Sequence, residues 1–384
     1  FFLALLIRIF FAPITASSDV GWFYEHALAF LRYSIDFYAH PTNYVYPPIW
    51  LMIVTISYLL AQPYVTAPSY PFDPVFRLAE KMPIVLADLV IGYLLYRILK
   101  GRRGLVAAAL WLFNFITIFE SSIFGQFDSI ITLFLLATLY AHSHNRNKLS
   151  GFFAGLALMT KQYSLFALTP LIFVTAGRSG KPRTEFVAVV LLIALVVSAP
   201  FISSNEALVR YISNVWLTRS SLDDWSWPHF LNEFTANEFC GFFQLGALIS
   251  DLTGMEFELF VPLCYFGFAC LALGIIWSSF LAYRGKLSSN QALLMGLTIF
   301  LTFSWYVNPQ YTLSVIPFLL LDTLSSNRRR IWVLAIFLPG LWPFLAYGLL
   351  YNFSTYAPIH YQSTHLLQPL RDLVFSPIGI MVWF

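Results

Sequence analysis

Apolar runs close to the length of a bilayer span recur along the whole chain, and they limit what it can fold into. A helix that crosses a bilayer needs about 20 mainly apolar residues. Of the 384 residues, 59% are hydrophobic and 11% are charged, whereas a soluble domain carries about 25% charged residues. The sequence therefore predicts an all-α polytopic membrane protein surrounded by membrane lipid.

Lys and Arg cluster in short loops between the apolar runs. Because positive residues favour the cytoplasmic side, these loops predict the topology. The clusters lie at Lys100–Arg103, Arg146–Lys148, Arg178–Arg183, Arg284–Lys286 and Arg328–Arg330. Between them we expect spans near 83–99, 104–119, 129–142, 184–201, 260–282, 291–306, 310–323 and 332–350, with a first span before residue 13 and a last one starting near 372. The total is about 11–12 spans.

Two long acidic stretches, 14–80 and 202–258, fall on the non-cytoplasmic side in this topology. We expect both outer loops to carry helices that lie in the membrane interface. In the first loop, apolar residues recur at near-helical spacing from Asp19 to Tyr33, which is typical of such a helix. Residues 47–80 are placed on the outer side as a hydrophobic hairpin.

The stretch 150–177 is too short for two full spans but must leave the cytoplasm and return. We therefore predict two short or bent helices with Lys161 at their outer apex. A lysine at membrane depth is costly, and no acidic residue lies near Lys161 in the sequence. Its ammonium group is suited to binding phosphate. The alternative is a lysine that snorkels from a helix end to the interface.

Asp19 follows the first span almost at once, in Ser17-Ser18-Asp19. A carboxylate at the outer face can accept the proton of an incoming hydroxyl group. The alternative is an N-cap of the helix that follows, and one residue can do both. Asp36, in the same loop but beyond the interfacial helix, is the rival base, whereas Glu25 points from within that helix.

Other polar residues interrupt the apolar runs at their outer ends. Gln126 and Asp128 stand where a span re-emerges and are suited to holding sugar hydroxyls; capping by Asp128 is the alternative. Trp225 and His229 belong either to a sugar-stacking platform or to an interfacial aromatic patch. Asp88 lies within a span and needs a partner, so we expect a structural ion pair or a helix cap.

The sequence lacks the motifs of several common kinds of enzyme and cofactor site. The sequence contains no P-loop, no dinucleotide-binding glycine motif, no zinc motif and no nucleophile elbow. The acidic residues form no tight Asp-x-Asp pair, so we expect no catalytic metal and no other cofactor. No feature indicates a nucleic-acid partner.

Six motifs in one order and topology resemble the GT-C superfamily of membrane glycosyltransferases. They are the acidic residue after the first span, Tyr46-Pro47-Pro48, Lys81-Met82-Pro83 with Asp88, Gly125-Gln126-Phe127-Asp128, Thr160-Lys161-Gln162-Tyr163, and Asn308-Pro309-Gln310-Tyr311. The closest likeness is to glucosyltransferases of asparagine-linked glycosylation and to related prokaryotic mannosyltransferase-like proteins. It covers about residues 14–320, within a single transmembrane domain of 1–384 whose helices at 81–201 form the catalytic module and are followed by C-terminal helices at 259–384.

The resemblance implies an inverting hexosyltransferase. The donor would be a polyprenyl- or dolichyl-phosphate mannose or glucose, and the acceptor a lipid-linked oligosaccharide or other glycan. Asp19 falls at the catalytic base and Lys161 at the donor phosphate. Asn308 stands where the glucosyltransferases have a functional histidine, and Asp128 where the eukaryotic relatives have an uncharged residue. We expect the substrates to contact Tyr46, Gln126, Asp128, Gln162, Trp225, His229, Asn308 and Gln310.

The active site would face the outside of a prokaryotic plasma membrane or the lumen of the endoplasmic reticulum. A membrane transporter or lipid flippase is the alternative function. Transporters often show repeated halves with broken helices at matching positions. Here no repeat is found, and the polar elements concentrate in the outer loops. A purely structural scaffold would leave Lys161 unexplained.

Overall fold

The computed structural model describes residues 1–325, apart from 43, 66–72, 177–179, 218–260 and 305–308. Within this part the regular elements are all helical. Among the described residues, three helices are long and apolar enough to cross a membrane, or four if one bent pair forms a single span. The predicted all-α membrane fold is confirmed. The predicted spans at 332–350 and from about 372 lie outside the described residues.

The amino-terminal part begins with short helices and continues into a long one. Its elements are α1 (Phe2–Phe11), α2 (Ser18–Tyr33), the 3-10 helix η1 (Ser34–Ala39), α3 (Pro48–Ala61), the 3-10 helix η2 (Gln62–Tyr64) and α4 (Pro74–Leu99). Helix α4 extends beyond the predicted span at 83–99, because Asp73 caps its first turn through Val75 N and Pro83 is accommodated inside the helix.

The next helices follow in the middle part of the sequence. They are α5 (Gly101–Leu112), α6 (Phe115–Ile118), the π-helix η3 (Phe119–Phe124), α7 (Asp128–Ser143), α8 (Asn147–Thr160), α9 (Ser164–Ala176), α10 (Gly180–Ser198), the 3-10 helix η4 (Ala199–Phe201), α11 (Asn205–Tyr211) and the π-helix η5 (Ile212–Leu217). The predicted pair of short helices around Lys161 is confirmed as α8 and α9. The predicted single span at 104–119 is instead broken: α5 and the helix that follows meet at a bend of 50°.

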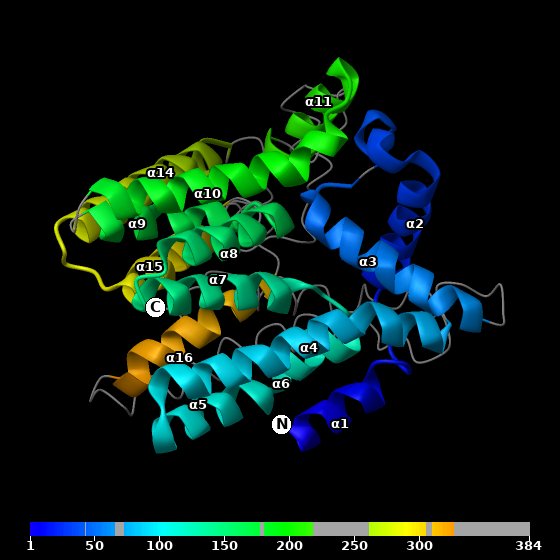
Figure 1. Cartoon of the computed structure of the whole chain (residues 1–384), viewed down its shortest axis with the longest axis horizontal. Coiled ribbons are helices and arrows are strands. Elements are labelled where there is room, and N and C mark those ends of the chain that lie inside the picture. Colours follow the sequence, from blue (N-terminus) through cyan, green and yellow to red (C-terminus); the bar gives the residue numbers. More distant parts are fainter. Residues whose placement is uncertain (43, 66–72, 177–179, 218–260, 305–308, 326–384) are drawn as a thin grey trace, which may run out of the picture.

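The last described helices are α14 (Val261–Tyr283), α15 (Ser289–Phe303), the 3-10 helix η7 (Pro309–Val315) and α16 (Ile316–Ser325). Helix α9 packs against α14 and α15, whereas α7 packs against α8 and α4. Figure 1 shows this bundle with α2, α3 and α11 gathered at one end and the α4–α5 and α14–α15 turns at the other. Described parts of both predicted outer loops thus share one end of the molecule.

Candidate functional site

Charged side chains gather inside the apolar bundle near the end that carries α2 and α3. Asp19 stands in the first turn of α2 and is partly exposed. The other members are buried: Glu80, Lys81, Glu120, Asp128 and Lys161. A buried charge is costly unless it has partners, so such a group within a membrane helix bundle is a functional-site candidate.

Asp19 is held by Gln126, whose Nε2 atom donates a hydrogen bond to Asp19 Oδ2. Gln126 is fully buried, and its Oε1 atom makes no hydrogen bond within the described part of the chain. The capping alternative for Asp19 is wrong, because Ser17 is the N-cap of α2 and Asp19 stands inside the helix. The hydrogen bond from Gln126 directs the Asp19 carboxylate toward the turn that follows η3.

Glu80 and Glu120 are two further carboxyl groups beside Asp19. Each interacts electrostatically with Asp19, and their carboxyl oxygens make no hydrogen bond among the described residues. Gly125 allows this close packing: its φ is +84°, and a Cβ atom there would lie 2.8 Å from Val20 Cγ2 and 3.3 Å from Glu80 Oε2. Buried polar groups without partners mark strain, catalysis or an absent ligand.

Lys161 lies between α8 and α9, where the backbone becomes extended. Its Nζ atom is 3.0 Å from Asp128 Oδ2 and 3.2 Å from Asp128 Oδ1. Tyr163 donates to Asp128 Oδ1 over 3.0 Å, and Tyr163 Oη lies 2.6 Å from Ser314 Oγ. Lys161 thus has the acidic partner that its sequence neighbourhood lacks. The capping alternative for Asp128 is wrong as well, because Asp128 pairs with Lys161 and makes no capping hydrogen bond.

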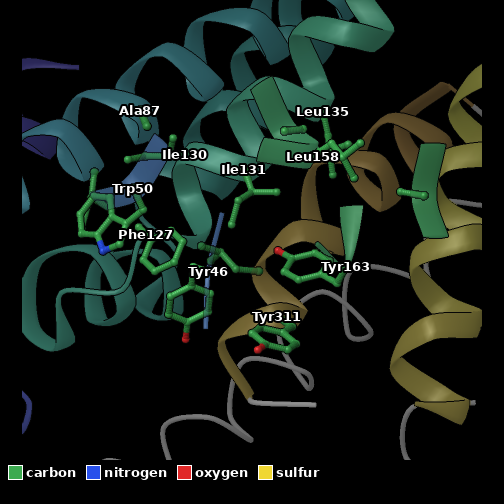
Figure 2. Close-up of a cluster of buried hydrophobic side chains, with 14 of the residues drawn as sticks. Tyr46, Trp50, Ala87, Phe127, Ile130, Ile131, Leu135, Leu158, Tyr163 and Tyr311 are labelled. Carbon is green, nitrogen blue, oxygen red and sulfur yellow. The ribbon is translucent and has the colours of Figure 1, made fainter. Parts of the chain in front are cut away.

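Four aromatic rings from the described part of the chain lie around the Lys161 ammonium group. Its Nζ atom lies 4.2 Å from the ring centre of Tyr311, 4.8 Å from that of Phe127 and 5.2 Å from that of Tyr46. The ring of Tyr163 is 5.7 Å away. Figure 2 shows the side chains of Tyr46, Phe127, Tyr163 and Tyr311 together. Cation–π contacts to a buried ammonium add to the stability of its charged form.

The remaining predicted substrate residues fall into two groups. Gln162 donates to Val45 O over 3.2 Å, beside Tyr46, and its Oε1 atom makes no hydrogen bond among the described residues. Gln310 is buried in η7 next to Tyr311. Gln162 follows Lys161 in the sequence, and Gln310 precedes Tyr311, whose ring lies 4.2 Å from Lys161 Nζ. Outside the described residues lie Asn308, Trp225 and His229.

Aromatic side chains of α2 pack against the rings of Tyr44 and Tyr46 beside this site. Trp22 stacks on Tyr44 at 5.7 Å between ring centres, and His26 lies 5.1 Å from the Tyr44 ring. His26 Nδ1 donates to Trp22 O over 2.6 Å, which leaves Nε2 as the unprotonated nitrogen of the neutral ring. Burial lowers the pKa of His26, because the charged imidazolium is poorly solvated there.

Asp88 belongs to a different part of the bundle. Its Oδ2 atom accepts from Arg8 Nε over 2.9 Å, and its Oδ1 atom accepts from Ser129 over 2.7 Å. Arg8 also donates to Leu112 O and Thr117 Oγ1. The predicted structural ion pair is confirmed, and it ties α1, α4, α5 and α7 together.

Sequence reasoning found Asp19, Gln126 and Lys161 but assigned no role to Glu80 or Glu120. The available signal was Glu-Lys at 80–81 and Glu-Ser-Ser at 120–122, each between apolar stretches. Among the described residues, no three His, Cys, Asp or Glu side chains are grouped so that they could hold a metal ion.

The structure is that of a membrane protein: an apolar helix bundle with buried charged side chains at one end. The sequence matches glycosyltransferase family 87 over residues 44–309. This match spans more than half of the chain, and the chain therefore belongs to that family of glycosyltransferases, of the GT-C type. It favours the glycosyltransferase over the transporter or flippase. Asp19 lies before the matched segment. A comparison with curated proteins found no match.

Proposed function

We propose that this glycosyltransferase moves a hexose, mannose or glucose, from a polyprenyl- or dolichyl-phosphate donor to a glycan or lipid-linked acceptor. The observation that carries the proposal is the partly exposed Asp19 carboxylate beside buried charged groups at one end of a membrane bundle. A donor that is itself a lipid explains why the site is built between apolar helices. The basic turns at the opposite end of the bundle support a non-cytoplasmic location of the candidate site.

In this mechanism Asp19 is the general base. It takes the proton of an acceptor hydroxyl while that oxygen attacks the anomeric carbon of the donor. The bond between the anomeric carbon and the phosphate oxygen breaks, and the lipid phosphate leaves from the opposite face with the electron pair. The configuration at the anomeric carbon is therefore inverted. The transition state has oxocarbenium character, as in other glycosyl transfers.

Lys161 supplies positive charge to the donor phosphate in the proposal. The ammonium is paired with Asp128 before the donor binds, so the phosphate must share Lys161 with that carboxylate or displace it. Tyr46, Gln126, Gln162 and Gln310 surround the position of the hexose. The uncompensated oxygen atoms of Gln126 and Gln162 are suited to accepting hydrogen bonds from sugar hydroxyls.

The test is transfer of radiolabelled hexose by purified protein in proteoliposomes. Polyprenyl-phosphate mannose and polyprenyl-phosphate glucose serve as donors, and octyl mannoside and octyl glucoside as acceptor probes. We expect transfer with one donor and a product of inverted anomeric configuration by NMR. Asp19→Asn should keep the fold and lower kcat by about a hundredfold or more, since it cannot take a proton.

Asp36→Asn is the matched control. Asp36 is an exposed carboxylate that accepts from Ser203 over 2.9 Å. Normal transfer by Asp19→Asn, with loss in Asp36→Asn, would move the base to Asp36. Ion or lipid flux without hexose transfer would overturn the proposed function altogether.

A further inference from the structure

Lys81 is a second buried lysine, and the proposed mechanism does not use it. It is fully buried in α4, and no hydrogen-bonded carboxylate is found for it among the described residues. Its Nζ atom instead lies 2.7 Å from Thr15 O, 3.0 Å from Ile123 O and 3.1 Å from Ser122 O, with Ala12 O and Thr15 Oγ1 within 3.3 Å. Lysine has three N–H donors, so its hydrogen-bonding capacity is filled by two backbone segments.

These two segments lead directly to the candidate base. Helix α1 packs against α4 and η3, and Figure 1 shows α1 beside α4. The chain after α1 continues to Asp19, and the chain after η3 continues to Gln126. Three side-chain contacts join the segments. Thr15 Oγ1 lies 3.1 Å from Ser122 O, Ser17 Oγ donates to Phe124 O over 2.6 Å, and Gln126 donates to Asp19.

All three contacts join residues that are 107 positions apart. The two segments therefore run side by side in one register, with a rung at every second residue. We call these three contacts the 15–126 ladder. Its first rung, at Thr15, is buried, whereas its last rung carries the partly exposed Asp19. Lys81 donates hydrogen bonds to Thr15 O and Ser122 O at the buried end of the ladder.

We propose that Lys81 is a positioning residue, which holds the 15–126 ladder in register and thereby sets the position of the Asp19 carboxylate. This inference rests on the proposed role of Asp19 as base. The physical reason is that four backbone carbonyl oxygens, from both segments, converge on one ammonium group. Without the ammonium these carbonyls lose their common donor, and the segments can shift relative to each other. A displacement of about 1 Å at a catalytic group costs about a hundredfold in rate.

The first test is kinetic. Lys81→Met should lower kcat by about a hundredfold and change the donor KM by less than about threefold, since the transition state and not the ground state depends on the base. Thr15→Val, which keeps the side-chain volume, and Ser17→Ala each remove one rung and should lower kcat by a smaller factor. These variants decide the question if Lys81→Met does not fold.

Arg8→Lys is the matched control. Arg8 is also a buried cation that binds backbone carbonyls, but it lies outside the ladder. Arg8→Lys should lower thermal stability and leave kcat per folded molecule unchanged. Equal losses of kcat in Arg8→Lys and Lys81→Met would show a general structural effect and overturn the inference.

The second test does not depend on catalysis. Asp19→Cys is made after the three natural cysteines are replaced by Ser, and its rate of reaction with an impermeant thiol reagent is measured with Lys81 and with Lys81→Met. We expect the rate to rise several-fold in the Lys81→Met background, whereas that of Ser203→Cys stays constant. Unchanged reactivity overturns the positioning role. Normal transfer by Asp19→Asn would instead refute the proposed function, even if the thiol reactivity changes as expected.

Discussion

Replacing Lys161 with Met removes the cation of a buried ion pair and leaves the Asp128 carboxylate inside the bundle. Removing one partner of such a pair costs about 3–5 kcal/mol, because the other charge stays buried without compensation. After the replacement, Asp128 keeps the hydrogen bond from Tyr163, which offsets a part of this cost. We expect Lys161→Met to lower the free energy of unfolding by about 3 kcal/mol or more.

Asp128→Asn leaves the ammonium but keeps an oxygen that accepts from Tyr163. Four aromatic rings still surround the ammonium, so this variant should be less destabilised than Lys161→Met. The double variant Lys161→Met/Asp128→Asn contains no buried charge at the pair. It should regain most of the stability. The sum of the two single losses in unfolding free energy should therefore exceed the loss in the double variant by about 2–3 kcal/mol.

The assay is unfolding of purified protein in detergent, followed by tryptophan fluorescence, combined with hexose transfer. Additive single effects, with a coupling below about 0.5 kcal/mol, would refute the ion pair. The same double variant tests the proposed phosphate contact. A stable double variant with a strongly raised donor KM supports that contact, whereas a stable double variant with a normal donor KM refutes it.

Three further predictions concern other parts of the molecule. Gly125→Ala should destabilise the protein by at least about 1 kcal/mol in the same unfolding assay, since its φ is positive and the added Cβ meets Val20; wild-type stability would contradict the packing described. Because the pKa of His26 is lowered in the folded state, the unfolded chain binds more protons, and stability should fall as the pH drops below about 6.5; His26→Asn should have a smaller pH dependence over this range, and an identical slope would refute the assignment. Ser203→Cys should react with an impermeant reagent from the outside and Lys148→Cys only after the cytoplasmic face is opened, and the reverse pattern would refute the topology.

Helices were predictable from the sequence where apolar runs and basic turns coincide. Helix α7, predicted at 129–142, begins at Asp128 and ends at Ser143. The break in α5–α6 was not predicted, because a single apolar run covers it. It arises where Asn114 accepts from Ile116 N and starts a new helix. Such a local competition between side-chain capping and helix continuation leaves almost no trace in hydropathy.

Several members of the candidate site could be singled out from the sequence, but their contacts could not. Lys161 and Asp128 are 33 positions apart, Arg8 and Asp88 are 80 apart, and the rungs of the 15–126 ladder are 107 apart. A polar residue in an apolar run shows that it needs a partner. Which partner it finds depends on helix packing, so the sequence alone could not distinguish a phosphate contact from an ion pair at Lys161.

The pairings also separate structural charges from those to which we assign a role in the proposed mechanism. Arg8 and Asp88 satisfy each other inside the bundle, and Lys81 is filled by backbone carbonyls, so neither position has capacity left for a substrate. In the proposed mechanism Lys161 has a different role, because the donor phosphate takes over or shares the interaction that Asp128 makes with it. Asp19 differs again, since it is partly exposed and stands at the end of a buried ladder. A base must be both accessible to its substrate and held in position, and Asp19 combines these two properties in the described part of the chain.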